Sequence, residues 1–193
     1  MQLPAPTSRL SFRAWNEDDL PHAKAIWGDA RLSTMHGGPY NEAQVRARLD
    51  AEIANQREYG VSYWQLVNAH GERIGCCGLA PREPARRIFE LGIYLLVPWW
   101  RQGYGGEAAH SVFAYAFGVL GSPAVFGGHH PDNHASRRTL LSLGFRYTHD
   151  ELWPPVGLMF PCYELRASDY SRLRKPGPRA NIGDGAGGAS SPQ

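Results

Sequence analysis

The sequence predicts a single α/β domain whose elements follow the order β-α-α-β-β-β-α-β-α-β-β. Apolar residues recur with period 2 in some segments and at helical spacing in others, and the two kinds of segment are interspersed along the chain. The 193 residues are enough for one domain with its own core, and 42% hydrophobic with 20% charged residues is typical of a globular chain.

The amino-terminal half predicts a strand, two helices, a hairpin and a central strand. Asn41 and Gln44 have capping-box spacing at the start of the second helix. The glycine- and proline-containing segment 35–40 before it predicts a loop. The predicted strands are 9–14, 61–69, 73–80 and 87–97, and the two helices follow Asn16 and Asn41. The last strand is almost wholly apolar, so we expect helices to cover both of its faces.

The carboxyl-terminal half predicts two more helices and three strands. The helices are 107–120 and 133–143, and the strands are 123–128, 145–152 and 160–166. From Ala167 the apolar periodicity is lost, and the chain becomes rich in Gly, Pro, Ala and Ser. We therefore predict a domain over residues 1–166 and a flexible tail over 167–193.

Charge, cysteine content and hydropathy exclude several classes of protein. A net charge of +2 is too small to indicate nucleic-acid binding, although it suits a polyanionic small ligand. Three cysteines without ligand-like spacing indicate neither a disulfide framework nor a zinc site. The amino terminus lacks a signal-peptide pattern, and the longest apolar run, 91–100, is about half a membrane span. We expect a cytoplasmic protein that binds no membrane.

The most informative segment is a buried strand that leads through a glycine turn into a helix. Residues 90–108 read ELGIYLLVPWWRQGYGGEA, with glycines at 103, 105 and 106. Glycines allow close backbone approach to a ligand, and the following helix presents its positive end, so a pyrophosphate fits the turn. A tight structural connection is the alternative. A dinucleotide-binding fold is disfavoured, because position 108 is Ala and the turn follows the fourth strand rather than the first.

A second block supports the ligand-binding interpretation. Residues 133–145 have the form N-x-x-S-x-x-x-L-x-x-L-G-F. Together the two blocks resemble the GNAT superfamily of N-acetyltransferases, particularly its ribosomal-protein-alanine N-acetyltransferase branch, over roughly residues 9–166. The resemblance implies the GNAT acyl-CoA N-acyltransferase fold, with a mixed, mostly antiparallel sheet splayed between the fourth and fifth strands. It also implies acetyl-CoA as cosubstrate and direct attack by an amine.

The resemblance implies a set of cofactor contacts and one catalytic residue. The expected acetyl-CoA contacts are Leu95, Val97, Arg101, Gln102, Gly103, Gly105, Gly106, Asn133 and Ser136. The tyrosine that often acts as acid in the superfamily is replaced by Leu140, so Ser136 is the candidate acid. The chain also departs from the branch pattern at Arg101, where glycine is usual, and at Gly106, where threonine is common.

Glu90 is the candidate general base, because it is a lone carboxylate in an apolar strand and burial would raise its pKa. Its structural alternative is an ion pair with Arg86 or Arg87. Ser136 could instead bond backbone at a helix start, and Asn133 could be an amino cap, a role compatible with ligand binding.

The acceptor is expected to be a primary amine, either a peptide amino terminus or a small molecule, and a homodimer is compatible with the sequence. We expect its pocket to combine the 35–40 loop with the hairpin around 153–161. The side chains offered there are His36, Tyr40, Trp153, Met159 and Tyr163. No metal site is expected, since His129, His130, Asp132 and His134 lack ligand spacing. A non-catalytic acyl-CoA-binding module and an interaction protein remain the alternatives to an enzyme.

Overall fold

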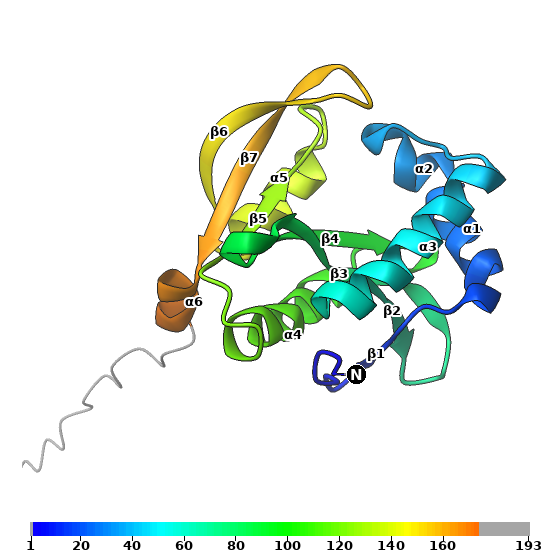
Figure 1. Cartoon of the computed structure of the whole chain (residues 1–193), viewed down its shortest axis with the longest axis horizontal. Helices are drawn as coiled ribbons and strands as arrows, with labels where there is room; N and C mark the ends of the chain where they lie inside the picture. The colour runs from blue at the N-terminus through cyan, green and yellow to red at the C-terminus, as the bar shows by residue number, and fades with distance from the viewer. Residues whose placement is uncertain (1, 174–193) are drawn as a thin grey trace, which may run out of the picture.

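The computed structural model describes residues 2–173, which form one seven-stranded sheet with helices on both faces (Figure 1). The strands are β1 (Leu10–Arg13), β2 (Tyr63–Asn68), β3 (Arg73–Glu83), β4 (Ile88–Leu95), β5 (Ala124–Gly128), β6 (Arg146–Trp153) and β7 (Leu158–Arg166). The helices are α1 (Leu20–Trp27), α2 (Ala30–Ser33), α3 (Glu42–Tyr59), α4 (Tyr104–Gly118), α5 (His134–Ser142) and α6 (Ala167–Leu173). Short 3-10 turns are η1 (Glu17–Asp19), η2 (Thr34–His36), η3 (Pro84–Arg86) and η4 (Val97–Trp99). The predicted element order is confirmed, with the short helices α2 and α6 added.

The sheet is mixed and mostly antiparallel, as expected. Its strand order is β1-β2-β3-β4-β5-β7-β6, and every neighbouring pair is antiparallel except β4 with β5. Helix α4 is the crossover between these two parallel strands. The carboxyl ends of β4 and β5 therefore lie at one edge of the sheet, and α4 and α5 both begin near that edge.

Helix boundaries follow local hydrogen bonding. Asn41 Oδ1 accepts from the Gln44 amide at 3.0 Å and Gln44 Oε1 accepts from the Asn41 amide at 2.9 Å, so the predicted capping box of α3 is formed. Helix α4 begins at Tyr104, three residues before the predicted start. Gly105 and Gly106 consequently lie in its first turn rather than in the loop before it.

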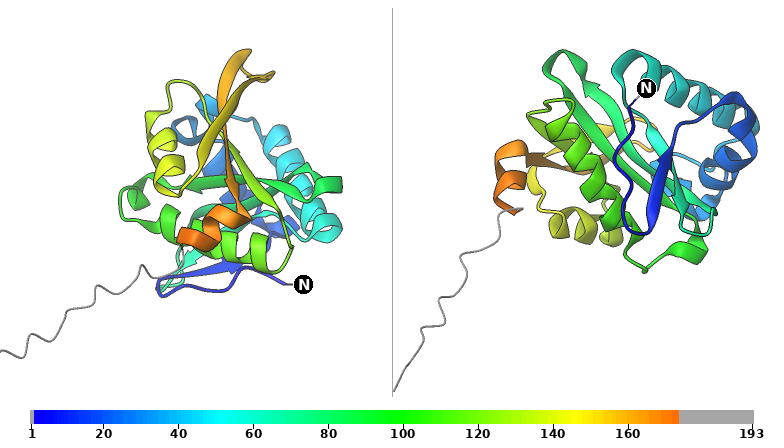
Figure 2. Two further views of the ribbon diagram at one scale, coloured as in Figure 1. Left: turned by 90° about the vertical axis from the view of Figure 1, so that its left-hand side faces the viewer. Right: turned by 90° about the horizontal axis from the view of Figure 1, so that it is seen from below.

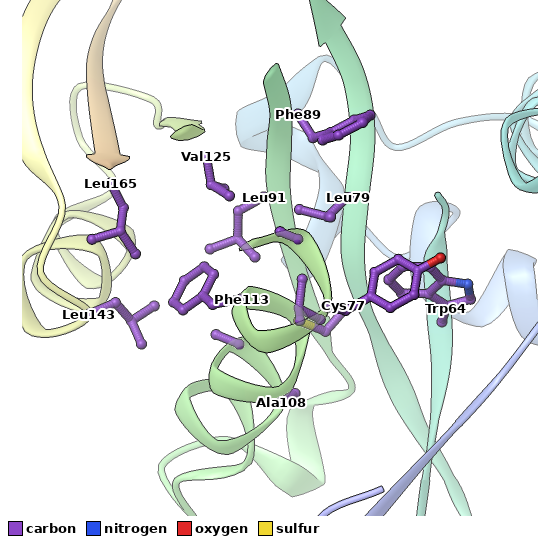
Figure 3. Close-up of a cluster of buried hydrophobic side chains, with 14 of the residues drawn as sticks. Trp64, Cys77, Leu79, Phe89, Leu91, Ala108, Phe113, Val125, Leu143 and Leu165 are labelled. Carbon is purple, nitrogen blue, oxygen red and sulfur yellow. The ribbon is translucent and has the colours of Figure 1, made fainter. Parts of the chain in front are cut away.

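Two apolar cores lie on opposite faces of the sheet. One packs α4 against the strands through Phe113, Leu91 and Val125 (Figure 3), and the other packs α1 and α3 against Tyr63 and Cys76. Figure 2 shows α4, α5 and α6 on one face and α1 and α3 on the other. Cys76 and Cys77 are both buried, one in each core, as their opposite orientation in a strand predicts.

The folded region extends past the predicted boundary at Arg166. Helix α6 follows β7 directly, and Tyr170 on it is buried in the α4 core, where its hydroxyl donates to the His110 carbonyl at 3.3 Å. Residues 167–173 are therefore part of the domain rather than of the tail. The rest of the predicted tail, 174–193, lies outside the described residues. None of the helices between residues 2 and 173 combines the length and hydropathy that crossing a bilayer requires.

Candidate active site

The sheet opens between β4 and β5. Only Phe89 and Glu90 of β4 have partners on β5, which are Val125 and Phe126. Beyond Glu90 the two strands part. The amide of Leu96 donates to Ile74 of β3, so by alternation the N–H and C=O groups of Leu95 point away from β3 and into the gap. The same alternation applies to Ile93. Among the described residues no strand pairs with these groups, and the Leu95 N–H and the Ile93 groups can pair with an extended, amide-containing ligand.

The turn after β4 presents a second set of free amides. Arg101 and Gly103 have φ values of 60° and 81°, which turn the chain sharply into α4. The first helical amide with an acceptor is that of Glu107, which donates to the Gly103 carbonyl at 3.1 Å. Among the residues that the structure describes, none accepts a hydrogen bond from the amides of 101–106. These donors, at the positive end of α4, suit a pyrophosphate.

The turn is held from behind by the amino-terminal segment. Arg9 Nη2 lies 2.5 Å from Glu107 Oε2, Arg9 Nη1 donates to the Gln102 carbonyl at 3.1 Å, and the guanidinium lies 4.4 Å from the Tyr104 ring centroid. The Thr7 hydroxyl donates to Glu107 at 2.5 Å. Burial alone would raise the pKa of Glu107, but the hydrogen bonds from Thr7 and Arg9 outweigh it and hold that pKa below its usual value.

Of the two cofactor contacts expected on the fourth strand, Leu95 lies on β4 and Val97 lies beyond it. Leu95 is the last residue of β4, and its carbonyl accepts from the Trp100 indole at 2.6 Å. In this conformation that carbonyl is occupied. Val97 lies beyond the strand in η4, where its carbonyl accepts from the Trp100 amide at 3.2 Å. The strand ends two residues earlier than predicted, because Pro98 lacks the N–H that would continue a ladder.

Asn133 and Ser136 lie at the start of α5, directly after β5. Asn133 Oδ1 accepts from the Ser136 amide at 3.0 Å, so the capping alternative for Asn133 is found. No hydrogen bond of the half-buried Ser136 hydroxyl is recorded in the described part of the chain. The alternative of a hydroxyl bonded to backbone is thus not observed, and this hydroxyl is free to meet a ligand.

Glu90 is half-buried at the point where β4 and β5 part. Burial raises its pKa above the usual value, and the charges of Arg82 and Arg48 oppose this rise without cancelling it. The alternative pairing with Arg86 is not observed, because Arg86 pairs with Glu83 at 2.9 Å. No ion pair of Glu90 is recorded within residues 2–173. A carboxyl group with a raised pKa and no partner is suited to proton transfer.

The two segments expected to line the acceptor pocket lie against each other. A Cβ on Gly37 would lie 2.9 Å from Pro155, so the η2 loop and the β6-β7 hairpin meet. The His36 ring packs 5.5 Å from the Tyr94 ring, and burial with the nearby charges of Arg48 and His130 lowers the pKa of His36 to about 4. His36 is therefore uncharged at neutral pH, and the aromatic rings offer apolar contact.

Tyr163 and Met159 were misassigned to that pocket. Side chains alternate along β7, and Tyr163 lies in the α4 core, stacked on His129. Met159, four residues away, shares its face and is exposed. Trp153 and Phe160 stack on the opposite face, at the acceptor side. The Tyr40 hydroxyl donates to the His36 carbonyl at 2.9 Å and so orders the loop.

Of the four residues weighed as metal ligands, His130 Nδ1 and Asp132 Oδ2 lie 3.9 Å apart, but the four form no group of three or more close ligand atoms in the part of the chain that the structure describes. His129 bonds to the His130 carbonyl and the Tyr163 hydroxyl, at 2.8 and 3.3 Å. Within residues 2–173 a different group, His149, Glu151 and Cys162, has its potential ligand atoms within 4.8 Å of one another. Its carboxylate already forms an ion pair with Arg82.

The open parallel pair, the free amides at the start of α4 and the Glu90 carboxyl group lie around one gap in the sheet. The sequence profile of the Acetyltransferase (GNAT) domain matches residues 9–146. The chain belongs to the GNAT acetyltransferase family. It is thus an acetyl-CoA-dependent N-acetyltransferase.

Similar proteins share the GNAT fold across most of the chain. The uncharacterized N-acetyltransferase YoaA of Bacillus subtilis is 33% identical over 143 residues, which cover 72% of this chain and 81% of YoaA. An acetyltransferase of known structure from Agrobacterium tumefaciens is 25% identical, with a TM-score of 0.74 over 86% of this chain and 96% of its own. RimL, a ribosomal L7/L12 α-N-protein acetyltransferase, shows the same fold at 14% identity, with a TM-score of 0.72 over 86% of this chain and 94% of RimL.

Several residues of this GNAT site were missed by sequence reasoning. Arg9 was noted only as the start of a strand, although its pairing with Glu107 positions the turn. Arg82, Phe126 and Glu151 gather around Glu90 from strands distant in sequence. Nothing in their spacing indicates that contact. Arg82 and Glu151 lie close to the ends of the predicted strands 73–80 and 145–152, where charged residues are common, so this placement was a weak signal.

Proposed function

We propose that this GNAT enzyme transfers the acetyl group of acetyl-CoA to a primary amine by direct attack in a ternary complex. The observation that carries the proposal is the parting of β4 and β5 at Glu90. It places unpaired strand groups, the amides of 101–106 and an unpaired carboxyl group around one gap. We propose that β4 amides pair with pantetheine, that residues 101–106 hold the pyrophosphate, and that Asn133 and Ser136 lie beside the thioester.

Each catalytic residue has one role in this proposal. Glu90 accepts a proton from the amine, through water, as the nitrogen forms its bond to the thioester carbonyl carbon. A backbone N–H of β4 donates to the developing oxyanion. Ser136 donates a hydrogen bond to sulfur as the C–S bond breaks. Acetyl-CoA supplies the activated acyl group, and the step uses neither a metal ion nor a covalent enzyme intermediate.

The acceptor is a peptide amino terminus or a small-molecule amine. Its pKa decides how much Glu90 contributes. An α-amine with a pKa of about 8 is partly neutral at pH 7.4, whereas a lysine-like amine with a pKa of about 10.4 must lose a proton against roughly 4 kcal/mol. We further propose that the enzyme acts in the cytoplasm, and a homodimer is compatible with the edge strand β6.

The test combines binding with turnover. Calorimetric titration with acetyl-CoA should show saturable binding, and release of CoA should then be screened against α-amines and lysine-like amines. Glu90→Gln should leave acetyl-CoA binding unchanged and lower kcat/KM by about 100-fold or more for a lysine-like amine. The control is Glu42→Gln, which removes an exposed carboxylate paired with Lys24. Binding without turnover for any amine would favour the acyl-CoA-binding module.

A further inference from the structure

An ion pair spans the acceptor face above Glu90. Arg82 of β3 pairs with Glu151 of β6, although β4, β5 and β7 separate these strands in the sheet. The Arg82 guanidinium also lies 4.3 Å from the ring centroid of Phe126 on β5. The side chain of Arg82 therefore reaches past β4 to the Phe126 ring and meets Glu151 there.

The Arg82 side chain and its contact with Phe126 lie beside Glu90. Phe126 is the partner of Glu90 in the short parallel ladder, and Ala80, two residues before Arg82, is the partner of Glu90 on β3. Arg82 lies in a bulge, between Pro81 and Glu83, where the β3-β4 register shifts. Bulges re-aim side chains, which accounts for the reach of Arg82 across the sheet. Arg82 thus lies between two carboxyl groups and pairs with only one of them.

The described groups around Glu90 other than Arg82 are either paired elsewhere or uncharged. They are Arg48 of α3, Tyr63 of β2, Tyr94 of β4, and Cys162 and Glu164 of β7. Arg48 is paired with Glu52 four residues away at 3.1 Å, and Glu164 is paired with Arg166 at 2.8 Å. Burial raises the pKa of both tyrosines, and raises that of Cys162 to about 11, so all three are uncharged at neutral pH.

We propose that Glu151 is a positioning residue that holds the Arg82 guanidinium away from Glu90 and so keeps the Glu90 carboxylate free to accept a proton. This inference rests on the proposed role of Glu90 as general base. The charge of Arg82 already acts on Glu90, so without Glu151 the Glu90 carboxylate is open to Arg82. A guanidinium pairs with a carboxylate through two parallel hydrogen bonds. Such a pair occupies the oxygens that proton transfer needs. His149, whose Nε2 lies 3.6 Å from Glu151, competes for the same carboxylate once it is protonated.

The test is the pH dependence of kcat/KM in a mutant cycle. The acid limb is the low-pH side of this profile, where protonation of Glu90 lowers kcat/KM. Glu151→Gln should move it to lower pH by about one unit, because Arg82 newly paired with Glu90 favours the ionised Glu90 carboxylate. Arg82→Gln should move the limb to higher pH. The Glu151 charge also raises the pKa of Glu90 directly, so the double variant should lie slightly below Arg82→Gln in pH, by that direct effect alone and by less than the shift in Glu151→Gln. Glu151→Asp, which keeps the charge, should lie between wild type and Glu151→Gln. Glu42→Gln should leave the limb in place.

A second measurement separates this inference from the role of Glu90. The Glu90 carboxyl carbon is titrated by NMR in each variant, with its signal assigned by its loss in Glu90→Gln. Movement of both the titration and the rate limb supports both proposals. Movement of the titration alone supports the positioning by Glu151 and rejects Glu90 as base. If neither moves in folded variants, or if the double variant follows Glu151→Gln, the inference is overturned.

Discussion

Replacing Gly103 or Gly106 with alanine should change stability in opposite directions. Gly103 precedes α4 with a φ of 81°, in the left-handed region, whereas Gly106 lies in the first turn of α4. An ideal Cβ on Gly106 would meet no heavy atom within 4 Å. The same chemical change is therefore strained at one position and accommodated at the other.

The magnitudes follow from these two environments. Alanine in the left-handed region costs about 1–2 kcal/mol, and the lower entropy of the unfolded chain returns about 0.4–1 kcal/mol. Gly103→Ala should thus destabilise the protein by about 1 kcal/mol. Gly106→Ala should stabilise it by about 0.5–1 kcal/mol, the usual difference between the two residues in a helix. For a domain of this size the two Tm values should differ by roughly 3–8 °C.

Thermal unfolding with and without acetyl-CoA measures both effects. Ligand at 100 times its Kd should stabilise the wild type by about 2.7 kcal/mol. Gly106→Ala should keep that increment, because the related branch carries threonine at this position. Gly103→Ala should lose much of it, because the amides of the turn would no longer converge. Equal Tm changes of the same sign in both variants would refute the assigned backbone geometry.

Three further substitutions test other parts of the site. Glu107→Ala removes the partner of Arg9 and should lower both stability and acetyl-CoA affinity. Because the pKa of Glu107 is lowered in the folded protein, the stabilisation by its carboxylate is lost as pH falls through that pKa. The Tm difference between this variant and the wild type should therefore shrink in acid. Burial raises the pKa of Glu90, so the wild type loses stability as pH rises through that pKa and the buried carboxyl group ionises. Glu90→Gln carries no such charge, and its Tm should exceed that of the wild type at pH 8 but not near pH 4. Gly92→Ala places a Cβ against the buried Tyr63 ring and should destabilise by about 1–3 kcal/mol, as measured by urea unfolding.

The sequence by itself determined the element order and the position of the ligand turn. Period-2 and helical patterns are local, so they survive without knowledge of partners, and the caps at Asn41 and Asn133 depend only on residues three positions away. The glycine turn could be placed for the same reason. Element boundaries were predicted less accurately. Helix α4 starts at Tyr104, before its predicted start. The seven-residue helix α6 was assigned to the tail, because so short a helix with one buried aromatic residue shows little apolar periodicity.

Only the tertiary structure decided what surrounds Glu90. The ion pair of Arg82 with Glu151 joins residues 69 positions apart, on strands separated by three others, and their contact depends on the bulge in β3 and on the twist of the sheet. The face on which Tyr163 lies depends on strand register, which one residue of slip reverses. Local patterns identify the carboxyl group that could act as a base, whereas its freedom to act depends on charges that only folding brings beside it.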